Sequence, residues 1–218
     1  MKPFLITGCG RSGTAYTAKL LTMCGIRTSH EEFFTPFTPY GDVSDFPQWL
    51  VRTHTEGEVS SVAAPVLDAL QSSVTIIHQV RNPVSVIRSL MGERQLHDES
   101  LFLPGAKMAF RYLPELKCDD PPIVRCMKYW IGWNGLVESQ ASRRFRVEFA
   151  LEDWLSGILF WPSVENINIR LTGSRYHGGR RDKTVSWQSL PGGFLKEQIE
   201  ATAARYGYTL EDLEGSTS

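Results

Sequence analysis

Short apolar runs alternate with segments of helical periodicity along the chain. Phe4–Thr7 is largely apolar, and Val74–Val80 is a longer run of mostly β-branched and apolar residues, a pattern typical of strands buried in a parallel sheet. The shorter runs Ile26–Ser29, Arg146–Phe149 and Ile167–Leu171 predict three further strands. The pattern therefore indicates a sheet assembled from strands that are far apart in the sequence.

Segments in which apolar residues recur at helical spacing follow most of these runs. They predict helices over Thr14–Cys24, Val59–Ser72, Pro83–Met91, Val124–Gln140, Leu151–Phe160 and Phe194–Tyr206. Glycines at positions 25 and 207 are expected to end two of them. Residues 30–48 and 92–122 show no clear period and are expected to form irregular loops. Recurrent strand–loop–helix units predict one α/β domain over residues 1–218, with a mostly parallel central sheet flanked by helices.

The composition excludes several classes of protein. Hydrophobic residues make up 42% of the 218 residues and charged residues 22%, which argues against a disordered or fibrous chain. Lysine and arginine number 23, aspartate and glutamate 24, and the net charge is -1, so we expect no nucleic-acid partner. No apolar run reaches the roughly 18 residues of a membrane span. The chain is expected to be a globular protein without a membrane span.

The cysteines and the first apolar run bear on the compartment. The cysteines at positions 9, 24, 118 and 126 show no CxxC spacing, and no cluster of histidine and cysteine suggests zinc. Free thiols in a reducing compartment are the simplest interpretation. The apolar run near the N-terminus is only about four residues long, too short for the apolar region of a signal peptide. These observations predict a cytoplasmic protein.

A glycine-rich loop, GCGRSGT at residues 8–14, lies between the first predicted strand and the first predicted helix. A strand, a glycine turn and a helix N-terminus form an anion site, because backbone N–H groups and the helix dipole point at the ligand. Gly8 and Gly13 have the spacing of the phosphate-binding loop GxxxxGK[ST], but Thr14 directly follows and the expected lysine is missing. Arg11 is a cation that could take its place. A structural tight turn is the alternative for this loop taken alone.

A second candidate for phosphate binding follows the longest predicted strand. Arg81 ends that strand, and Ser89 comes eight residues later, about two turns into the next helix. A guanidinium and a hydroxyl in this arrangement can close on one phosphate group. The alternative is that Arg81 pairs with a surface carboxylate and that Ser89 is solvated.

The two segments together resemble the sulfotransferases that use PAPS (3′-phosphoadenosine 5′-phosphosulfate). RSGT at residues 11–14 resembles the arginine form of the family's 5′-phosphosulfate loop, which protein-tyrosine sulfotransferases and many bacterial members share. VRNPVSVIRS at residues 80–89 resembles the family's 3′-phosphate segment. The family usually has a second threonine where this chain has Ala15. Residues 129–148 and 184–208 are more loosely similar to later parts of family members.

This resemblance implies a fold, a reaction and a set of site residues. The fold would be the three-layer α/β architecture of P-loop NTPases. The reaction would move a sulfuryl group from PAPS, in line and without a metal, to a hydroxyl or amine of a small-molecule, glycan or peptide acceptor, leaving PAP. Arg11 would stabilise the leaving phosphate. The residues that would bind the cofactor are Gly10, Arg11, Ser12, Gly13, Thr14, Ala15, Arg81 and Ser89.

An acceptor hydroxyl also needs a general base, and three consecutive residues are candidates. Glu32 lies 21 residues after Arg11, where the resemblance to protein-tyrosine sulfotransferases places a catalytic glutamate. Many bacterial members have a His-Glu pair instead, which would favour Glu31 or His30. Side chains alternate along an extended segment, so the two glutamates are not both expected to face the site. The arginine form of the loop favours Glu32, and a solvated acidic pair is the alternative.

A late basic loop adds two candidates for the cofactor site. Arg180 and Arg181 lie in a glycine-flanked segment, and cytosolic sulfotransferases use a late basic loop on the 3′-phosphate. A solvated surface turn is the alternative. The aromatic residues between positions 30 and 57 favour an acceptor with an apolar or ring surface, with an aromatic satellite core as the alternative.

Two rival functions compete with sulfuryl transfer. The first is a P-loop nucleotide or small-molecule kinase, which the missing lysine and the lack of a recognisable Mg²⁺-binding aspartate after a strand disfavour. The second is a binding protein without catalytic activity, which the intact Arg11, Ser12, Arg81 and Ser89 disfavour.

Overall fold

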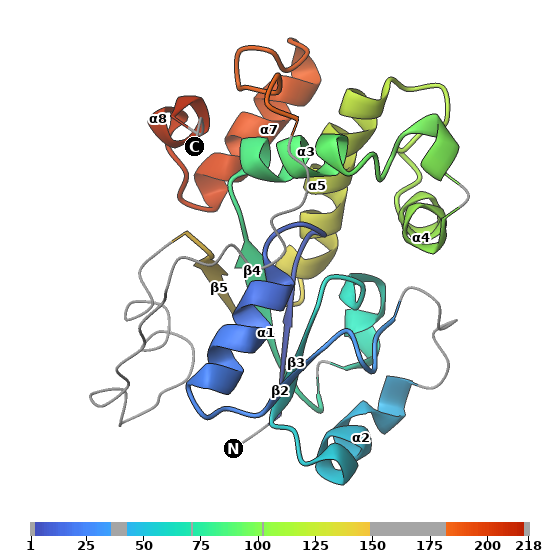
Figure 1. The fold of residues 1–218 in the computed structure, drawn as a ribbon, viewed down its shortest axis with the longest axis vertical. Helices are drawn as coiled ribbons and strands as arrows, with labels where there is room; N and C mark the ends of the chain where they lie inside the picture. Colours follow the sequence, from blue (N-terminus) through green and yellow to red (C-terminus); the bar gives the residue numbers. More distant parts are fainter. Residues whose placement is uncertain (1–2, 36–42, 71, 102, 149–181, 216–218) are drawn as a thin grey trace.

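The computed structural model describes residues 3–35, 43–70, 72–101, 103–148 and 182–215. Within them the chain forms an α/β fold around a five-stranded sheet with the order β2-β3-β1-β4-β5, in which every neighbouring pair is parallel. The strands are β1 (Phe4–Thr7), β2 (Thr28–His30), β3 (Gly57–Ser60), β4 (Thr75–Val80) and β5 (Arg143–Arg146). Figure 1 shows the sheet in the middle of the molecule, with helices around it.

The connections between the strands are mostly helical. The α-helices are α1 (Thr14–Met23), α2 (Phe46–Thr53), α3 (Pro83–Gly92), α4 (Pro104–Tyr112), α5 (Pro122–Glu138), α7 (Phe194–Arg205) and α8 (Leu210–Glu214). Short 3₁₀ helices are η1 (Val43–Asp45), η2 (Ala64–Ala69) and η3 (Asp98–Ser100). In Figure 1, α3, α4 and α7 lie beyond the carboxyl ends of the strands.

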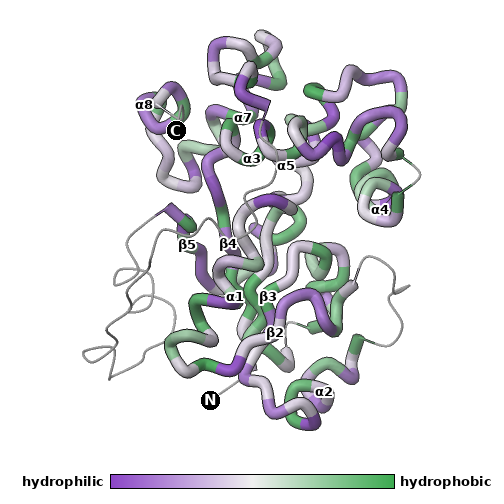
Figure 2. Tube along the Cα trace, in the orientation of Figure 1, coloured by the Kyte–Doolittle hydropathy of each residue, from purple (hydrophilic) through white to green (hydrophobic). Residues whose placement is uncertain are grey.

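The strand register explains why helices cover both faces of the sheet. Ile6 pairs with Val59 on one side and Ile77 on the other, and all three pack with buried residues of α1. Leu5 is the next residue in the strand and points to the opposite face, because side chains alternate along a strand. There it belongs to the larger cluster with Trp130 of α5. Hydrophobic stretches accordingly gather around the sheet (Figure 2). The sheet and the helices on its two faces form three layers.

Much of the predicted order is confirmed. The strands at Phe4–Thr7 and Thr75–Val80 and the four helices α1, α3, α5 and α7 lie within two residues of their predicted bounds. The predicted α/β class with a parallel sheet flanked by helices is confirmed as well. The tryptophans at 130 and 133 are fully buried in the core. All four cysteines are unpaired thiols, and burial raises the pKa of Cys126 to about 12.

Several predictions about secondary structure were wrong. The predicted helix Val59–Ser72 begins inside strand β3 and continues only as the short 3₁₀ helix η2. Strand β3 was not predicted, because its sequence is GEVS and contains only one large apolar residue. Residues 92–122 contain α4, and α2 begins within the predicted loop 30–48. Strand β5 lies at Arg143–Arg146 rather than Arg146–Phe149. The predicted helix 151–160 and strand 167–171 fall outside the described residues.

Candidate functional site

A cavity of about 450 Å³ opens where the parallel strands end. Its polar lining comes from the loop after β1, the end of β2, and the residues that follow β3 and β4. Its other side is formed by the end of α3, by Gln95 and Leu96 after that helix, and by α4 with the preceding Leu103. Its volume falls within the roughly 300–1,000 Å³ of sites for small ligands. The carboxyl edge of a parallel sheet is where such folds place their ligands.

The glycine loop is held tightly against β4. A Cβ atom on Gly8 would lie 2.0 Å from the carbonyl oxygen of Gln79, so only glycine permits this approach. The buried Gln79 side chain donates a 2.8 Å hydrogen bond from Nε2 to the carbonyl of Ser12. Gly13 is the N-cap of α1 and has a φ of 93°, and Arg11 has the left-handed φ of 68°. The loop therefore has a fixed shape that its sequence and β4 impose together.

The two segments singled out in the sequence meet at this cavity. Nε of Arg11 donates a 2.9 Å hydrogen bond to Oγ of Ser89, which is 78 residues away in the chain. Nη1 of Arg81 donates to the carbonyl oxygen of Arg11 at 3.0 Å. Arg11, Arg81 and Ser89 all line the cavity, so two guanidinium groups and a hydroxyl converge there. Glu93 is a partly exposed partner of Arg11, with 3.7 Å between Oε1 and Nη2.

Helix α5 carries three aromatic side chains that hold the ends of three strands. The backbone N–H of Gly10, after β1, donates to the hydroxyl of Tyr129 at 3.3 Å. The indole of Trp130 donates to the carbonyl of Arg81, after β4, at 3.4 Å. The indole of Trp133 donates to the carbonyl of Ser61, after β3, at 2.8 Å. Tyr129 also lines the cavity, so α5 both shapes the cavity and fixes the loops around it.

The three base candidates are placed differently from one another. His30, the last residue of β2, lines the cavity with Nε2 3.2 Å from Oγ1 of Thr14. Glu31 also lines the cavity, and its Oε1 accepts hydrogen bonds from the backbone N–H and hydroxyl of Ser61 at 3.2 and 2.6 Å. Glu32 is exposed and is not among the lining residues. The alternation argument does not apply, because Glu31 has the left-handed φ of 52° and turns the chain.

The remaining predicted residues either have a defined position or lie outside the described residues. Gly10, Gly13, Thr14 and Ala15 line the cavity, whereas Ser12 is buried within the loop. Arg180 and Arg181 lie outside the described residues. In the part of the chain that the structure describes, no group of three or more His, Cys, Asp and Glu side chains could hold a metal ion.

The aromatic residues after β2 form a core instead of lining the cavity. The rings of Phe33 and Phe34 lie 4.9 Å apart, and Phe34 lies 4.8 Å from Phe46. Trp49 packs on the same cluster. Among the described residues of 30–57, no Phe, Tyr or Trp lines the cavity. These aromatic side chains are core residues, as the alternative expected, but they belong to the larger hydrophobic cluster and not to a satellite of it.

Sequence reasoning missed several residues of the cavity. Ser61 directly follows β3 and would have been a candidate had that strand been recognised. Tyr16 of α1 and Tyr129 of α5 carry no local signal, because an aromatic residue on an amphipathic helix is usually a core residue. The wall formed by α4 lay in a segment predicted to be irregular.

A buried carboxylate positions the segment that holds the base candidates. The side chain of Glu58, on β3, has 0% exposure and accepts hydrogen bonds from the hydroxyl of Ser29 and the backbone N–H groups of Phe33 and Phe34, each at 3.0 Å. It therefore fixes the chain on both sides of His30 and Glu31. Burial raises the pKa of Glu58 to about 7, although these hydrogen bonds act in the opposite direction.

A buried histidine lies on the neighbouring part of the sheet. His78 on β4 places Nε2 3.0 Å from Oδ1 of Asn134, and Nε of Arg144 donates to its Nδ1 at 3.3 Å. The ring is neutral in this arrangement, with Nε2 as the donor. Burial lowers the pKa of His78 to about 4, and the charge of Arg144 acts in the same direction.

These two groups are expected to have opposite effects on the pH dependence of stability. The raised pKa of Glu58 stabilises the fold at low pH, and this contribution is lost as the pH rises from about 4.5 to 7. The lowered pKa of His78 destabilises the fold as the pH falls from about 6.5 to 4. As the pH rises from about 4.5 to 7, the free energy of unfolding of Glu58→Gln should increase by on the order of 3 kcal/mol relative to that of the wild type. As the pH rises from about 4 to 6.5, the free energy of unfolding of His78→Gln should decrease by a similar amount relative to that of the wild type.

Urea unfolding of both variants and the wild type at several pH values between 4 and 8 measures these differences. Parallel curves for Glu58→Gln and wild type would show that Glu58 does not titrate in the folded protein.

Comparisons with known proteins add no assignment. No family model matches the chain, and the search of curated proteins found no similar protein. Among the described residues, no helix is both long and apolar enough to cross a membrane. The residues and the geometry of this cavity are therefore what indicates a function.

Proposed function

We propose that the protein is a sulfotransferase that uses PAPS to transfer a sulfuryl group to a hydroxyl or amine of a small-molecule, glycan or peptide acceptor. The observation that carries the proposal is the hydrogen bond between Arg11 and Ser89. It joins two segments that separately resemble the 5′-phosphosulfate loop and the 3′-phosphate segment of that family. One cavity lined by both segments suits a ligand with anionic groups at two positions. A cytoplasmic location, where the cysteines would stay reduced, belongs to the same proposal.

The described residues of the cavity fit such a ligand. Arg11 and Arg81 provide two cations, and α1 begins at the loop, so its N-terminal dipole favours an anion there. The loop also contains Ser12, whose buried Oγ has no hydrogen-bond partner among the described residues. In this proposal Arg11, Gly13 and Thr14 contact the phosphosulfate, and Arg81 and Ser89 contact the 3′-phosphate.

The chain's own residues would then divide the work of transfer. Sulfuryl transfer forms a bond from sulfur to the acceptor oxygen and breaks the bond from sulfur to the bridging oxygen, whose electron pair leaves with PAP. Arg11 would stabilise the charge that develops on that oxygen. Glu31 would accept the proton of the acceptor hydroxyl, because its carboxylate lines the cavity and is held in place by Ser61.

A ligand screen tests the proposal against its rivals. PAP at 100 times its Kd is expected to raise the free energy of unfolding by about 2.7 kcal/mol, and thermal unfolding measures this. ATP with Mg²⁺ and GTP serve as comparison ligands and are expected to give smaller shifts. Stabilisation by ATP with Mg²⁺ but not by PAP would support the kinase, and stabilisation without transfer from PAPS to any acceptor would support the binding protein.

Sulfuryl transfer is expected to survive EDTA. The loop has Thr14 where a kinase loop would have its lysine, and its cation is Arg11, so the guanidinium is expected to supply the charge stabilisation that a metal supplies in phosphoryl transfer. Transfer from radiolabelled PAPS, assayed with and without the chelator, measures this. Complete loss in EDTA with recovery on adding Mg²⁺ would contradict the expectation and favour the kinase.

Arg81→Ala is expected to weaken binding of PAP at least about tenfold, since a charge-assisted contact is worth roughly 1.5–3 kcal/mol. Adenosine 5′-phosphosulfate, which lacks the 3′-phosphate, should lose much less. Calorimetry with both ligands measures the difference. Arg81 also donates to the carbonyl of Arg11, so equal losses for both ligands would make it a residue that positions the loop and would remove it from the 3′-phosphate site.

A further inference from the structure

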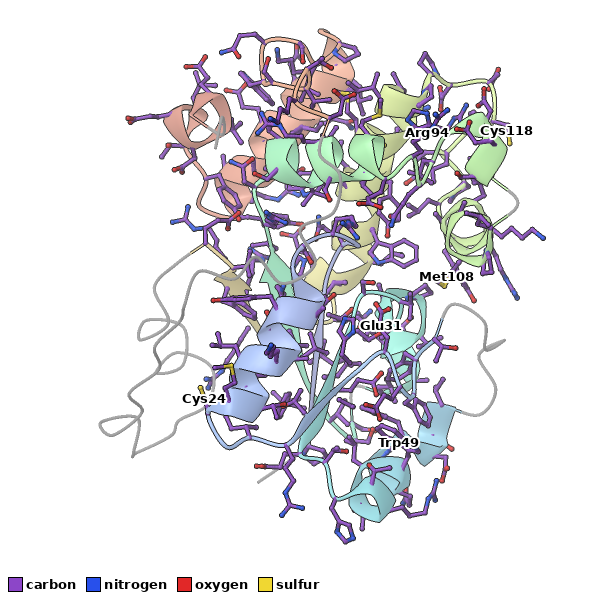
Figure 3. All side chains as sticks on the ribbon, viewed as in Figure 1. Cys24, Glu31, Trp49, Arg94, Met108 and Cys118 are labelled. Carbon is purple, nitrogen blue, oxygen red and sulfur yellow. The ribbon has the colours of Figure 1, made fainter. Side chains whose placement is uncertain are left out.

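The cavity has two chemically different halves. The half at the ends of the strands contains the charged and hydroxyl-bearing side chains of Arg11, Thr14, Glu31, Ser61, Arg81 and Ser89. The half between the end of α3 and α4 is mostly apolar and is lined by Leu90, Leu96, Leu103, Ala106, Met108 and Ala109. None of the described residues that line this second half carries a charge. In Figure 3, Glu31 and Met108 mark the two halves, with Met108 on α4 beyond the carboxyl edge of the sheet.

Helix α4 presents small residues to the cavity. Gly105, Ala106 and Ala109 all line it, and their spacing places Ala109 one turn after the other two. Both alanines are almost fully buried. A Cβ atom on Gly105 would meet no other heavy atom within 4 Å. Besides Met108, the described α4 residues that line the cavity are therefore small, which leaves room there for the body of a ligand.

We infer that the acceptor is a small, uncharged alcohol or phenol with an apolar body, which packs on α4 while its hydroxyl reaches Glu31. This inference rests on the proposed function. An acidic or highly hydroxylated acceptor would lose water against the α4 wall without finding hydrogen-bond partners there, which is unfavourable. An apolar body gains free energy by leaving water at the same wall.

An acceptor panel tests the chemical class. The full-length protein is assayed with radiolabelled PAPS and four acceptors: 2-naphthol, cyclohexylmethanol, an acidic tyrosine-containing peptide and a desulfated heparin fragment. Transfer to one or both of the neutral compounds, with kcat/KM at least tenfold above both charged acceptors, is expected, since about 1.4 kcal/mol of discrimination gives this ratio. Preference for the peptide or the glycan would overturn the inference and leave sulfuryl transfer standing. PAP binding without transfer to either neutral compound would also overturn it, whereas absence of PAP binding would remove the proposed function itself.

A variant of the wall tests the place of binding. Gly105→Leu places a larger side chain at a position with open space and so narrows the cavity. It should raise the KM of the better neutral acceptor at least about tenfold and leave the affinity for PAP unchanged. Gly135→Leu is the matched control, because Gly135 is a helical glycine with no atom within 4 Å of its Cβ and does not line this cavity. A loss of PAP affinity in Gly105→Leu would show that the wall holds the nucleotide instead, and an unchanged KM would show that it holds neither; both results would overturn the inference.

Discussion

Glu31→Gln is expected to lower kcat by roughly 10²–10⁴-fold, the usual contribution of a general base. The substitution removes the proposed proton acceptor and keeps the shape of the side chain. An amide oxygen in the place of Oε1 can still accept both hydrogen bonds from Ser61, so thermal unfolding should change little. PAP affinity should also be nearly unchanged, because the base contacts the acceptor and not the donor. Single-turnover kinetics and calorimetry measure the two quantities.

The neighbouring residues are matched controls for this variant. Glu32→Gln removes the same charge one position later, at an exposed side chain that does not line the cavity, so kcat should stay close to wild type. His30→Asn alters a side chain that does line the cavity and contacts Thr14, so a moderate loss is expected. A large loss for Glu32→Gln alone would favour the assignment made from spacing over the one made from geometry. Three variants with wild-type kcat would mean that this segment contains no base.

The sequence was most informative where local patterns decide the structure. The apolar run of β1, the glycine loop and the helix α1 follow one another with little dependence on the rest of the chain. The proline at the start of α3 and its N-cap Asn82, which accepts a hydrogen bond from the backbone N–H of Ser85, likewise mark that helix locally. Both candidate phosphate segments lie at such junctions, which is why they could be identified before the fold was known.

Strand β3 depended on tertiary contacts that its sequence does not reveal. Its GEVS sequence includes a glycine and a glutamate, both unfavourable in strands. The strand lies between β1 and β2, and Gly57 packs under the ring of Phe4, which is 2.5 Å from the position of a Cβ atom. Glu58 is tolerated because the hydroxyl of Ser29 in β2 and the backbone N–H groups of Phe33 and Phe34 after β2 donate three hydrogen bonds to its carboxylate. None of these partners is close to β3 in the sequence.

The candidate anion-binding residues of the site could be predicted, whereas the turn at Glu31 and the apolar wall could not. Arg11, Arg81 and Ser89 could be named from motifs, since the chemistry of anion binding restricts the residue types. The turn at Glu31 could not, because a left-handed φ at a glutamate leaves no trace in the sequence, and it changes which glutamate reaches the cavity. The apolar wall of α4 requires the three-dimensional path of residues 92–122, whose prolines obscure the helical pattern.

Replacing Arg11 by alanine is expected to lower kcat by roughly 10²–10³-fold, the loss seen when one preorganised donor to a developing anion is removed. The side chain lines the cavity and is oriented by the hydrogen bond from its Nε to Ser89. Arg11→Lys keeps the charge but replaces the planar fork by a point charge, so it should lose less activity than Arg11→Ala and more than a conservative surface change. Initial rates at saturating PAPS and acceptor measure these effects.

Arg11→Gly separates the role of the side chain from that of the backbone. Arg11 has a φ of 68°, a conformation that disfavours any residue with a Cβ atom by roughly 1–2 kcal/mol and leaves glycine unstrained. Arg11→Gly should therefore unfold at higher denaturant concentration than Arg11→Ala, with a free energy of unfolding about 1 kcal/mol larger. Both variants lack the guanidinium, so both should be equally inactive. A glycine variant that recovers activity along with stability would mean that the alanine variant fails through a distorted loop, and the guanidinium would then have no part in the transfer step.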